Sequence, residues 1–249
     1  RLEATVYRPE FEGKLPLVII NHGSTSGGAV PNAQTNTYEP QARFFLDRGF
    51  AVIAPMRKGR GKSEGSYCES EAQGCDFDAW SLGLASALED LEGVIEYACT
   101  LPYVDPVRIV LVGMSRGGFL SVAYSGRGQA RQRVLGVINF VGGWVCDWWC
   151  PDDFNRVSFS TFGKQAQHRM LWLYADNDAT YGESSVRSYA KAFIDAGGQA
   201  DFKLYSGVPG DGHYLQNHLG VWEADANRFL ESLGFAKLGA PGREPPYSM

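Results

Sequence analysis

The chain contains 249 residues, of which 44% are hydrophobic and 20% are charged, the balance of an average globular protein with a sizeable core. Its net charge of −5, with no basic stripe to neutralise phosphates, argues against a nucleic-acid partner. No apolar run approaches the roughly 18 residues that span a bilayer, and residues 1–20 lack the charged start and apolar stretch of a signal peptide. We therefore expect one globular domain with no membrane partner, acting on a small neutral or modestly charged molecule.

Short β-branched runs bounded by Gly, Pro and Asn alternate along the chain with longer helical patterns. This alternation predicts an α/β fold with a mostly parallel central sheet covered by helices on both faces. After a strand-like opening at 2–8, the elements expected in chain order are a strand at 17–21, a helix at 39–48, a strand at 51–55, a helix at 79–99, a strand at 108–113, a helix at 116–125, strands at 134–141 and 170–175, a helix at 183–197, a strand at 201–206 and a helix at 221–233.

Two stretches interrupt the alternation. Residues 57–78 are rich in Gly, Ser and charge, and residues 142–168 are rich in Trp and Asp. Loops at the carboxyl ends of parallel strands are where such folds keep their sites. We expect a single catalytic domain over 1–238 without a large lid, followed by a Pro- and Gly-rich tail at 239–249.

The segment 110–119 consists of an apolar strand, a Gly-x-Ser-x-Gly turn centred on Ser115, and the start of a helix. Such a turn needs small flanking residues because strand and helix nearly touch there, and it holds the serine hydroxyl out at the end of the sheet. The first helical residue, Arg116, presents its backbone N–H and the positive end of the helix dipole to a developing oxyanion. These features predict Ser115 as a nucleophile.

A serine hydroxyl is a poor nucleophile without a histidine base and an acid that orients the base, and in chains with this turn both follow the serine. His213 lies in a Gly-rich loop directly after the last expected strand, where it can reach over the sheet edge. It is the favoured base. His168, which precedes a strand, and His218, one helical turn further on, are the alternatives.

Two aspartates follow the strand expected at 170–175 and are candidates for the acid. Asp178 falls in the loop that can turn toward His213, and we choose it. Asp176 is the alternative, although a residue so close to the strand end more often caps the loop.

A second oxyanion donor is expected after the strand at 17–21, which ends in Asn21-His22-Gly23. The backbone must approach the substrate closely there, and the N–H of Ser24 is our candidate. His22 precedes the serine in the chain, so we expect it to orient the loop by hydrogen bonds rather than to act as the base.

Aromatic residues after the strand at 134–141 are candidates for the wall of a substrate pocket. No His and carboxylate pair has catalytic-metal spacing, and we expect neither a metal nor a cofactor. The pocket candidates are Trp144, Trp148 and Trp149, with Tyr181 and Tyr214 as lesser ones.

The five cysteines form two close pairs and one single residue. Cys68 with Cys75 and Cys146 with Cys150 are candidates for local disulfides, which leaves Cys99 in a helix. Reduced thiols are the equal alternative. Oxidised pairs would favour a secreted or periplasmic protein, and reduced ones a cytoplasmic protein.

Together these motifs resemble the α/β-hydrolase superfamily, and within it the dienelactone-hydrolase-like branch of esterases and peptidases. The resemblance implies the α/β-hydrolase fold, a triad of Ser115, Asp178 and His213, and oxyanion donors at Ser24 and Arg116. It rests on residues 21–23, 57–65, 104–109, 113–118, 174–178 and 212–213, which span nearly the whole chain.

In dienelactone hydrolases proper the nucleophile is a cysteine, so the serine at 115 shifts the expected activity to general ester hydrolysis. We expect an esterase for short to medium, or aromatic, acyl groups. Two alternatives stay open at this point: a peptidase or amidase of the same fold, and a binding module without catalysis.

Overall fold

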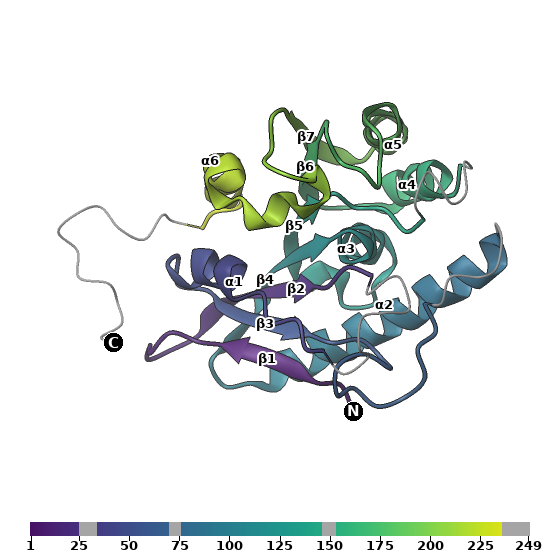
Figure 1. Ribbon diagram of the computed structural model, residues 1–249. Helices are drawn as coiled ribbons and strands as arrows, with labels where there is room; N and C mark the ends of the chain where they lie inside the picture. The colour runs from purple at the N-terminus through teal and green to yellow at the C-terminus, as the bar shows by residue number, and fades with distance from the viewer. Residues whose placement is uncertain (25–33, 70–75, 146–152, 236–249) are drawn as a thin grey trace.

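The computed structural model describes residues 1–24, 34–69, 76–145 and 153–235. Its central element is a seven-stranded sheet with the strand order β1-β3-β2-β4-β5-β6-β7 (Figure 1). Only the pairing of β1 with β3 is antiparallel among the described strands. The strands are β1 Ala4–Tyr7, β2 Leu15–Asn21, β3 Ala51–Pro55, β4 Val104–Met114, β5 Val134–Phe140, β6 Arg169–Ala175 and β7 Gln199–Tyr205.

Helices cover both faces of this sheet. Helices α1 and α6 lie on one face, and α2, α3, α4 and α5 lie on the other (Figure 1). This confirms the predicted α/β-hydrolase architecture in a single domain. The helices are α1 Glu39–Leu46, α2 Phe77–Thr100, α3 Arg116–Arg127, α4 Phe154–Gln165, α5 Glu183–Asp195 and α6 Leu219–Ser232, and two short 3₁₀ helices are η1 Arg131–Arg133 and η2 Gly212–Asn217.

Aromatic side chains fill the two layers between the helices and the sheet. On one face, Phe44 of α1 packs edge-on against Trp222 of α6, with ring centroids 4.9 Å apart. On the other, Phe119 of α3 contacts Phe159 and Phe162 of α4 at 4.9 and 5.2 Å. These aromatic contacts bury large apolar surfaces where α1 meets α6 and where α3 meets α4.

One helix was not expected from the sequence. Residues 142–168 were predicted to be irregular, yet Phe154–Gln165 forms α4. Its buried residues recur at helical spacing, but Ser, Thr, Val and Phe give the segment a weak intrinsic helix preference. Packing against α3 and α5 outweighs that preference.

The parallel order places four chain segments at one sheet edge. Because β2, β4, β6 and β7 run in the same direction, the segments that follow them all emerge at their common carboxyl end. Those segments begin with His22, Ser115 and Asp176 after β2, β4 and β6, and with η2 a few residues after β7. The fold therefore gathers the predicted site residues at this edge.

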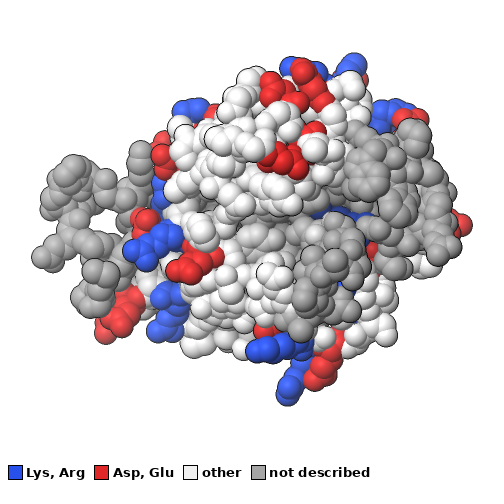
Figure 2. All heavy atoms as spheres, viewed as in Figure 1, with Lys and Arg blue, Asp and Glu red and all other residues white. Residues whose placement is uncertain are grey.

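The surface carries both signs of charge. Figure 2 shows Lys and Arg side chains interspersed with Asp and Glu on the face in view. Within the described ranges, no helix combines the length and apolarity that crossing a bilayer requires.

Candidate active site

Ser115 lies at the sharp turn between β4 and α3. Its backbone has φ 53° and ψ −121°, a conformation that a non-glycine residue rarely adopts. A Cβ on Gly113 would come within 2.0 Å of the Gly117 carbonyl oxygen, and one on Gly117 within 2.1 Å of the Asn21 carbonyl oxygen. The Ser115 amide donates a hydrogen bond of 2.9 Å to the Phe140 carbonyl. Close contacts with both neighbouring strands thus hold the strained turn that the Gly-x-Ser-x-Gly motif predicted.

Asp178 and His213 are in direct contact. Both carboxylate oxygens of Asp178 lie 3.1 Å from Nδ1 of His213. The Asp178 side chain is fully buried and also accepts the backbone N–H groups of Thr180, at 2.7 Å, and Tyr181, at 3.0 Å. With the carboxylate ionised, Nδ1 carries the proton and Nε2 is left as the acceptor. This is the orientation that a general base requires.

The turn after β7 fixes the position of His213. Asp211, the residue that caps η2, accepts the backbone N–H of His213 at 2.9 Å and that of Ala179 at 3.0 Å. The carboxylate of Asp211 thus joins the turn that carries His213 to the turn that carries Asp178. The loop expected around His213 is therefore a short 3₁₀ helix attached to the neighbouring segment.

Tyr181 connects this pair to the serine. Its ring centroid lies 5.5 Å from that of His213, and a Cβ on Gly143 would lie 2.4 Å from its ring carbon Cζ. The Gly143 amide in turn approaches the Ser115 carbonyl oxygen at 3.4 Å. The three residues predicted as nucleophile, acid and base therefore belong to one neighbourhood.

The alternative residues lie elsewhere. Asp176 donates its backbone N–H to the Tyr205 carbonyl at 2.9 Å, as an extension of the sheet. His168 precedes β6 and lies at the amino end of the sheet, opposite the Ser115 edge. His218 precedes α6 and donates its backbone N–H to Leu215. Within the part of the chain that the structure describes, none of the three forms a hydrogen bond or ion pair with Ser115, Asp178 or His213.

The turn after β2 lies directly against the nucleophile. A Cβ on Gly23 would be 3.2 Å from the Cβ of Ser115. His22 donates from Nδ1 to the Gly23 carbonyl at 2.7 Å and accepts the Arg57 amide at Nε2, 3.0 Å away. Burial, aided by the charge of Arg57, lowers the pKa of His22 from 6.5 to about 3. His22 is therefore a neutral orienting residue, in the position expected of it.

Tyr38 covers the other side of this turn. Its backbone is left-handed, with φ 54°, and its ring packs against the core beside α1. Burial raises the pKa of the Tyr38 phenol to about 12, although a hydrogen bond with the Gly23 backbone acts in the opposite direction. The phenol therefore stays protonated at neutral pH.

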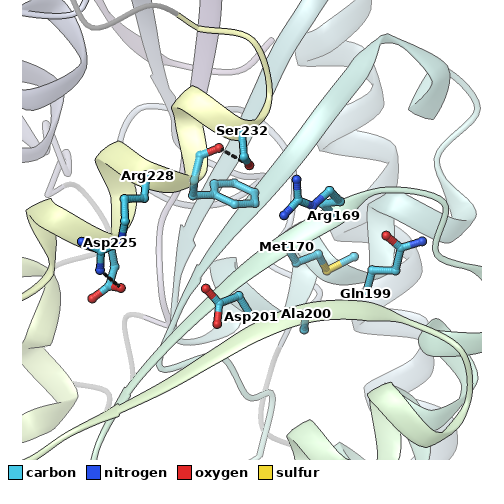
Figure 3. A pocket seen from close by; sticks show the side chains of 9 residues that line it. Arg169, Met170, Gln199, Ala200, Asp201, Asp225, Arg228 and Ser232 are labelled. Carbon is cyan, nitrogen blue, oxygen red and sulfur yellow. Dashed lines mark hydrogen bonds and ion pairs between the residues drawn. The ribbon is translucent and has the colours of Figure 1, made fainter.

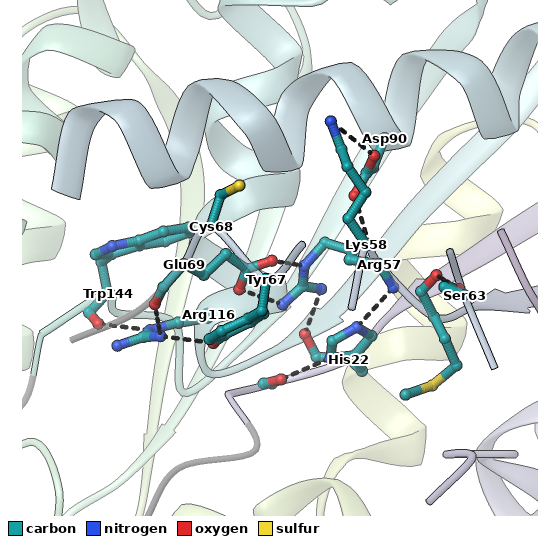
Figure 4. A network of polar contacts seen from close by, with 12 residues as sticks. His22, Arg57, Lys58, Ser63, Tyr67, Cys68, Glu69, Asp90, Arg116 and Trp144 are labelled. Atoms are coloured by element: carbon teal, nitrogen blue, oxygen red, sulfur yellow. Dashed lines mark hydrogen bonds and ion pairs between the residues drawn. The ribbon is translucent and has the colours of Figure 1, made fainter. Parts of the chain in front are cut away.

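A buried polar network adjoins the same turn, and the sequence interpretation did not include it (Figure 4). Arg57 and Glu69 form an ion pair whose side chains are 3% and 4% exposed. The Arg116 guanidinium lies beside them and donates to the carbonyls of Trp144 and Glu69. The sequence predicts a role for the backbone N–H of Arg116 but none for its side chain. The signal for this network in the sequence is the presence of charged residues in the Gly-rich stretch 57–78. Whether those residues are buried depends on the tertiary fold.

A family model described as the dienelactone hydrolase family matches residues 2–218. The chain belongs to this family. The match includes β1 to β7, Ser115, Asp178 and His213. The family resemblance inferred from the motifs is confirmed.

Solved structures with a similar fold include esterase 2 of Thermogutta terrifontis. Its form phosphorylated by paraoxon has a TM-score of 0.66 at 18% identity, over 96% of this chain and 91% of that one. Its butyrate-bound form has a TM-score of 0.64 at 18% identity, over 96% and 92% of the two chains. This dienelactone hydrolase family member therefore shares the fold of a known esterase.

A curated relative matches over a shorter stretch. The quorum-quenching protein AidA of Acinetobacter baumannii (strain MDR-ZJ06) is 29% identical over 118 residues. The match covers 47% of this family member and 33% of AidA, so the chain spans about a third of the length of that relative.

The predicted pocket residues differ in their environment. Trp144 and Tyr181 are 2% and 1% exposed, and Trp144 packs against Phe119 with ring centroids 5.7 Å apart. Tyr214, beside His213, is 56% exposed. Trp148 and Trp149 lie outside the described residues, as does the tail at 239–249.

The disulfide prediction is corrected at Cys68. Among the described cysteines, Cys68 and Cys99 are both free thiols, and Cys68 approaches the Ser66 carbonyl at 3.3 Å. The thiol thus contacts the backbone of its own loop rather than a second sulfur. Cys75, the proposed partner of Cys68, lies outside the described residues, as do Cys146 and Cys150.

One cavity lies away from the candidate site. It has a volume of about 510 Å³ and is formed by the starts of β6 and β7 and by α6, with Arg169, Asp201 and Arg228 on its walls (Figure 3). Because it lies at the amino ends of the strands, it faces away from the Ser115 edge. No group of three or more metal-ligating side chains occurs within the described residues.

Proposed function

We propose that this protein is a serine esterase that hydrolyses carboxylic esters with short to medium acyl groups through Ser115, His213 and Asp178. The observation that carries the proposal is the buried Asp178 carboxylate on Nδ1 of His213, at the same sheet edge as the strained turn of Ser115. Membership of a hydrolase family supports the reaction class.

The chemistry follows from the positions of these groups. Ser115 attacks the ester carbonyl while Nε2 of His213 takes its proton and passes it to the leaving alcohol. Asp178 holds the imidazole in the required tautomer and stabilises its protonated form. A water molecule, activated by the same imidazole, then hydrolyses the acyl-enzyme. No cofactor takes part in this scheme.

Two backbone amides are proposed to stabilise the oxyanion. Arg116 is the first residue of α3, where the backbone N–H groups and the positive end of the helix dipole favour negative charge. Ser24 follows Gly23, which lies against Ser115. Two such amides beside the serine would stabilise the negative charge that develops on the substrate oxygen in the transition state.

The substrate class is supported by the structural relative. Esterase 2 of Thermogutta terrifontis has been solved with butyrate bound and in a paraoxon-phosphorylated form. The fold it shares with this chain can therefore accommodate a small acyl group, and we propose the same for this protein. A peptidase or amidase is the competing activity, because the same triad also cleaves amides.

The first test combines a covalent probe with a substrate panel. A fluorophosphonate should label Ser115, and Ser115→Ala should lose at least about 10⁴-fold of the p-nitrophenyl acetate activity because the nucleophile is gone. A series of p-nitrophenyl esters of increasing acyl length, assayed beside an aminoacyl amide, then measures pocket depth and bond preference. Undiminished hydrolysis by a folded Ser115→Ala variant would reject the proposal, and faster cleavage of the amide would favour the peptidase.

A further inference from the structure

Arg57, the second residue after β3, holds the turn that precedes the proposed oxyanion donor Ser24. Its guanidinium Nη1 donates to the His22 carbonyl at 2.8 Å, and its backbone N–H donates to Nε2 of His22 at 3.0 Å. Arg57 thus fixes both the backbone carbonyl and the Nε2 atom of His22. Since Gly23 follows His22 and lies against Ser115, Arg57 sets where this backbone approaches the reacting serine.

Glu69 fixes Arg57 in turn. The two side chains form a bidentate ion pair (Figure 4). Nε of Arg57 donates to one carboxylate oxygen of Glu69, and Nη2 donates to the other at 2.9 Å. Burial alone would raise the pKa of Glu69, but the charge and hydrogen bonds of Arg57 lower it below its usual value. The pair is therefore ionised at neutral pH although it is shielded from water.

The same glutamate also holds the residue that follows the nucleophile. The backbone carbonyl of Glu69 accepts Nη1 of Arg116 at 2.7 Å. That guanidinium also donates to the Trp144 carbonyl at 3.0 Å and to the Tyr67 hydroxyl at 3.2 Å. Arg116 thereby joins the start of α3 to the segment 67–69 and to the loop after β5.

These contacts link Glu69 to both sides of the proposed oxyanion hole. Its carboxylate acts on the Ser24 side through Arg57 and His22, and its carbonyl acts on the Arg116 side. Stability alone does not require such a pair, because well-packed apolar residues of similar volume often stabilise a core as well as a buried ion pair does. Directional contacts, in contrast, hold backbone amides to within fractions of an ångström, which transition-state stabilisation requires.

We propose that Glu69 is a positioning residue, which keeps the two backbone segments carrying the Ser24 and Arg116 amides at the spacing that an oxyanion needs. The proposal rests on the proposed function. It assigns to the Gly-rich stretch after β3 a role in the reaction, exerted through Arg57 and Arg116 without contact with the substrate.

The decisive variant is Glu69→Gln, assayed on a p-nitrophenyl ester with active sites counted by a fluorophosphonate. We expect kcat to fall about 10- to 100-fold, because misplacement of a donor acts mainly on the transition state. KM should change little. The inhibition constant of a trifluoromethyl ketone, whose serine adduct carries an oxyanion, should rise by the same factor as kcat falls.

A double variant separates positioning from folding. In Arg57→Met with Glu69→Met, both members of the buried ion pair are removed together, so the melting temperature should recover relative to Glu69→Gln. The value of kcat should stay low, since Met cannot bind the His22 carbonyl. If melting temperature and kcat recover together, Glu69 has a structural role only and the proposal is overturned.

Lys58→Gln is the matched control. Lys58 is the neighbour of Arg57, pairs with Glu89 and Asp90 at 3.3 and 3.4 Å, and is partly exposed. Its loss should leave kcat within about 2-fold of the wild type. Wild-type kcat in Glu69→Gln, with Ser115→Ala inactive, would overturn this inference alone, whereas an active Ser115→Ala would overturn the proposed function and this inference with it.

Discussion

Two aspartates, Asp176 and Asp178, lie two positions apart after β6, and their surroundings give them different chemistry. Asp178 is buried, accepts two backbone N–H groups and contacts Nδ1 of His213. Asp176 continues the pairing of β6 with β7 through its backbone N–H. The Asp178 carboxylate thus contacts His213, whereas the contact that Asp176 makes with β7 comes from its backbone.

A pair of substitutions tests this difference. Asp178→Asn removes the negative charge that stabilises the protonated imidazole, and it places an NH₂ donor beside Nδ1 of His213 where the second carboxylate oxygen lay. We expect kcat on a p-nitrophenyl ester to fall about 10³- to 10⁴-fold. Asp176→Asn should change kcat by less than about 10-fold. The opposite order of effects would assign the acid to Asp176.

At the scale of elements, the turn between β4 and α3 depends on close approach of three backbones. Gly113 and Gly117 are the positions where a Cβ would collide with the Gly117 and Asn21 carbonyls respectively. A Cβ at position 117 would push α3 away from β2, the strand that leads to the turn of the proposed oxyanion donor Ser24. The glycine requirement of the motif is therefore a requirement of packing between elements.

Two glycine substitutions in helices should have opposite effects on stability. Gly117→Ala places a Cβ 2.1 Å from the Asn21 carbonyl oxygen and should destabilise the protein by at least about 2 kcal/mol. Gly93→Ala, on the exposed side of α2 with open space around the new Cβ, should stabilise it by about 0.8 kcal/mol. Urea unfolding measures both free energies, and equal stability of the two variants would contradict the packing argument.

At the scale of the whole molecule, the ionisation of buried groups links folding to pH. The pKa of His22 is about 3 in the folded state and near 6.5 when unfolded, so between these values the unfolded chain binds a proton that the folded chain does not. The pKa of Glu69 is also lowered by folding, after the opposing effect of burial. His22 therefore makes the protein less stable as the pH falls below about 6.5, and Glu69 adds to this loss below about 4.5.

The contribution of His22 can be isolated with His22→Gln, which keeps an acceptor for the Arg57 amide but does not titrate. Between pH 7 and pH 5 the wild type should lose about 2 kcal/mol of unfolding free energy that this variant retains. Urea unfolding at the two pH values measures the difference. An equal loss in both proteins would show that His22 is protonated in the folded state.

The sequence by itself determined the parts of this protein that depend on local order. β-branched runs and helical periods predicted the described strands, β1 as the strand-like opening at 2–8, and the helices α1, α2, α3, α5 and α6, with shifts of a few residues at their ends. The Gly-x-Ser-x-Gly turn predicted the strained conformation of Ser115, because strand, turn and helix are adjacent in the chain. The motifs were also sufficient to recognise the family.

Only the tertiary structure decided what depends on residues far apart in the chain. Helix α4 exists because α3 and α5 pack against it, and Asp178 faces His213 because η2 is held against the turn after β6. The buried contacts of Glu69 join segments that precede and follow it by 12 and 47 positions. A charged residue in a polar loop carries no local sign of burial, because its desolvation and its partners are set by the elements that fold over it.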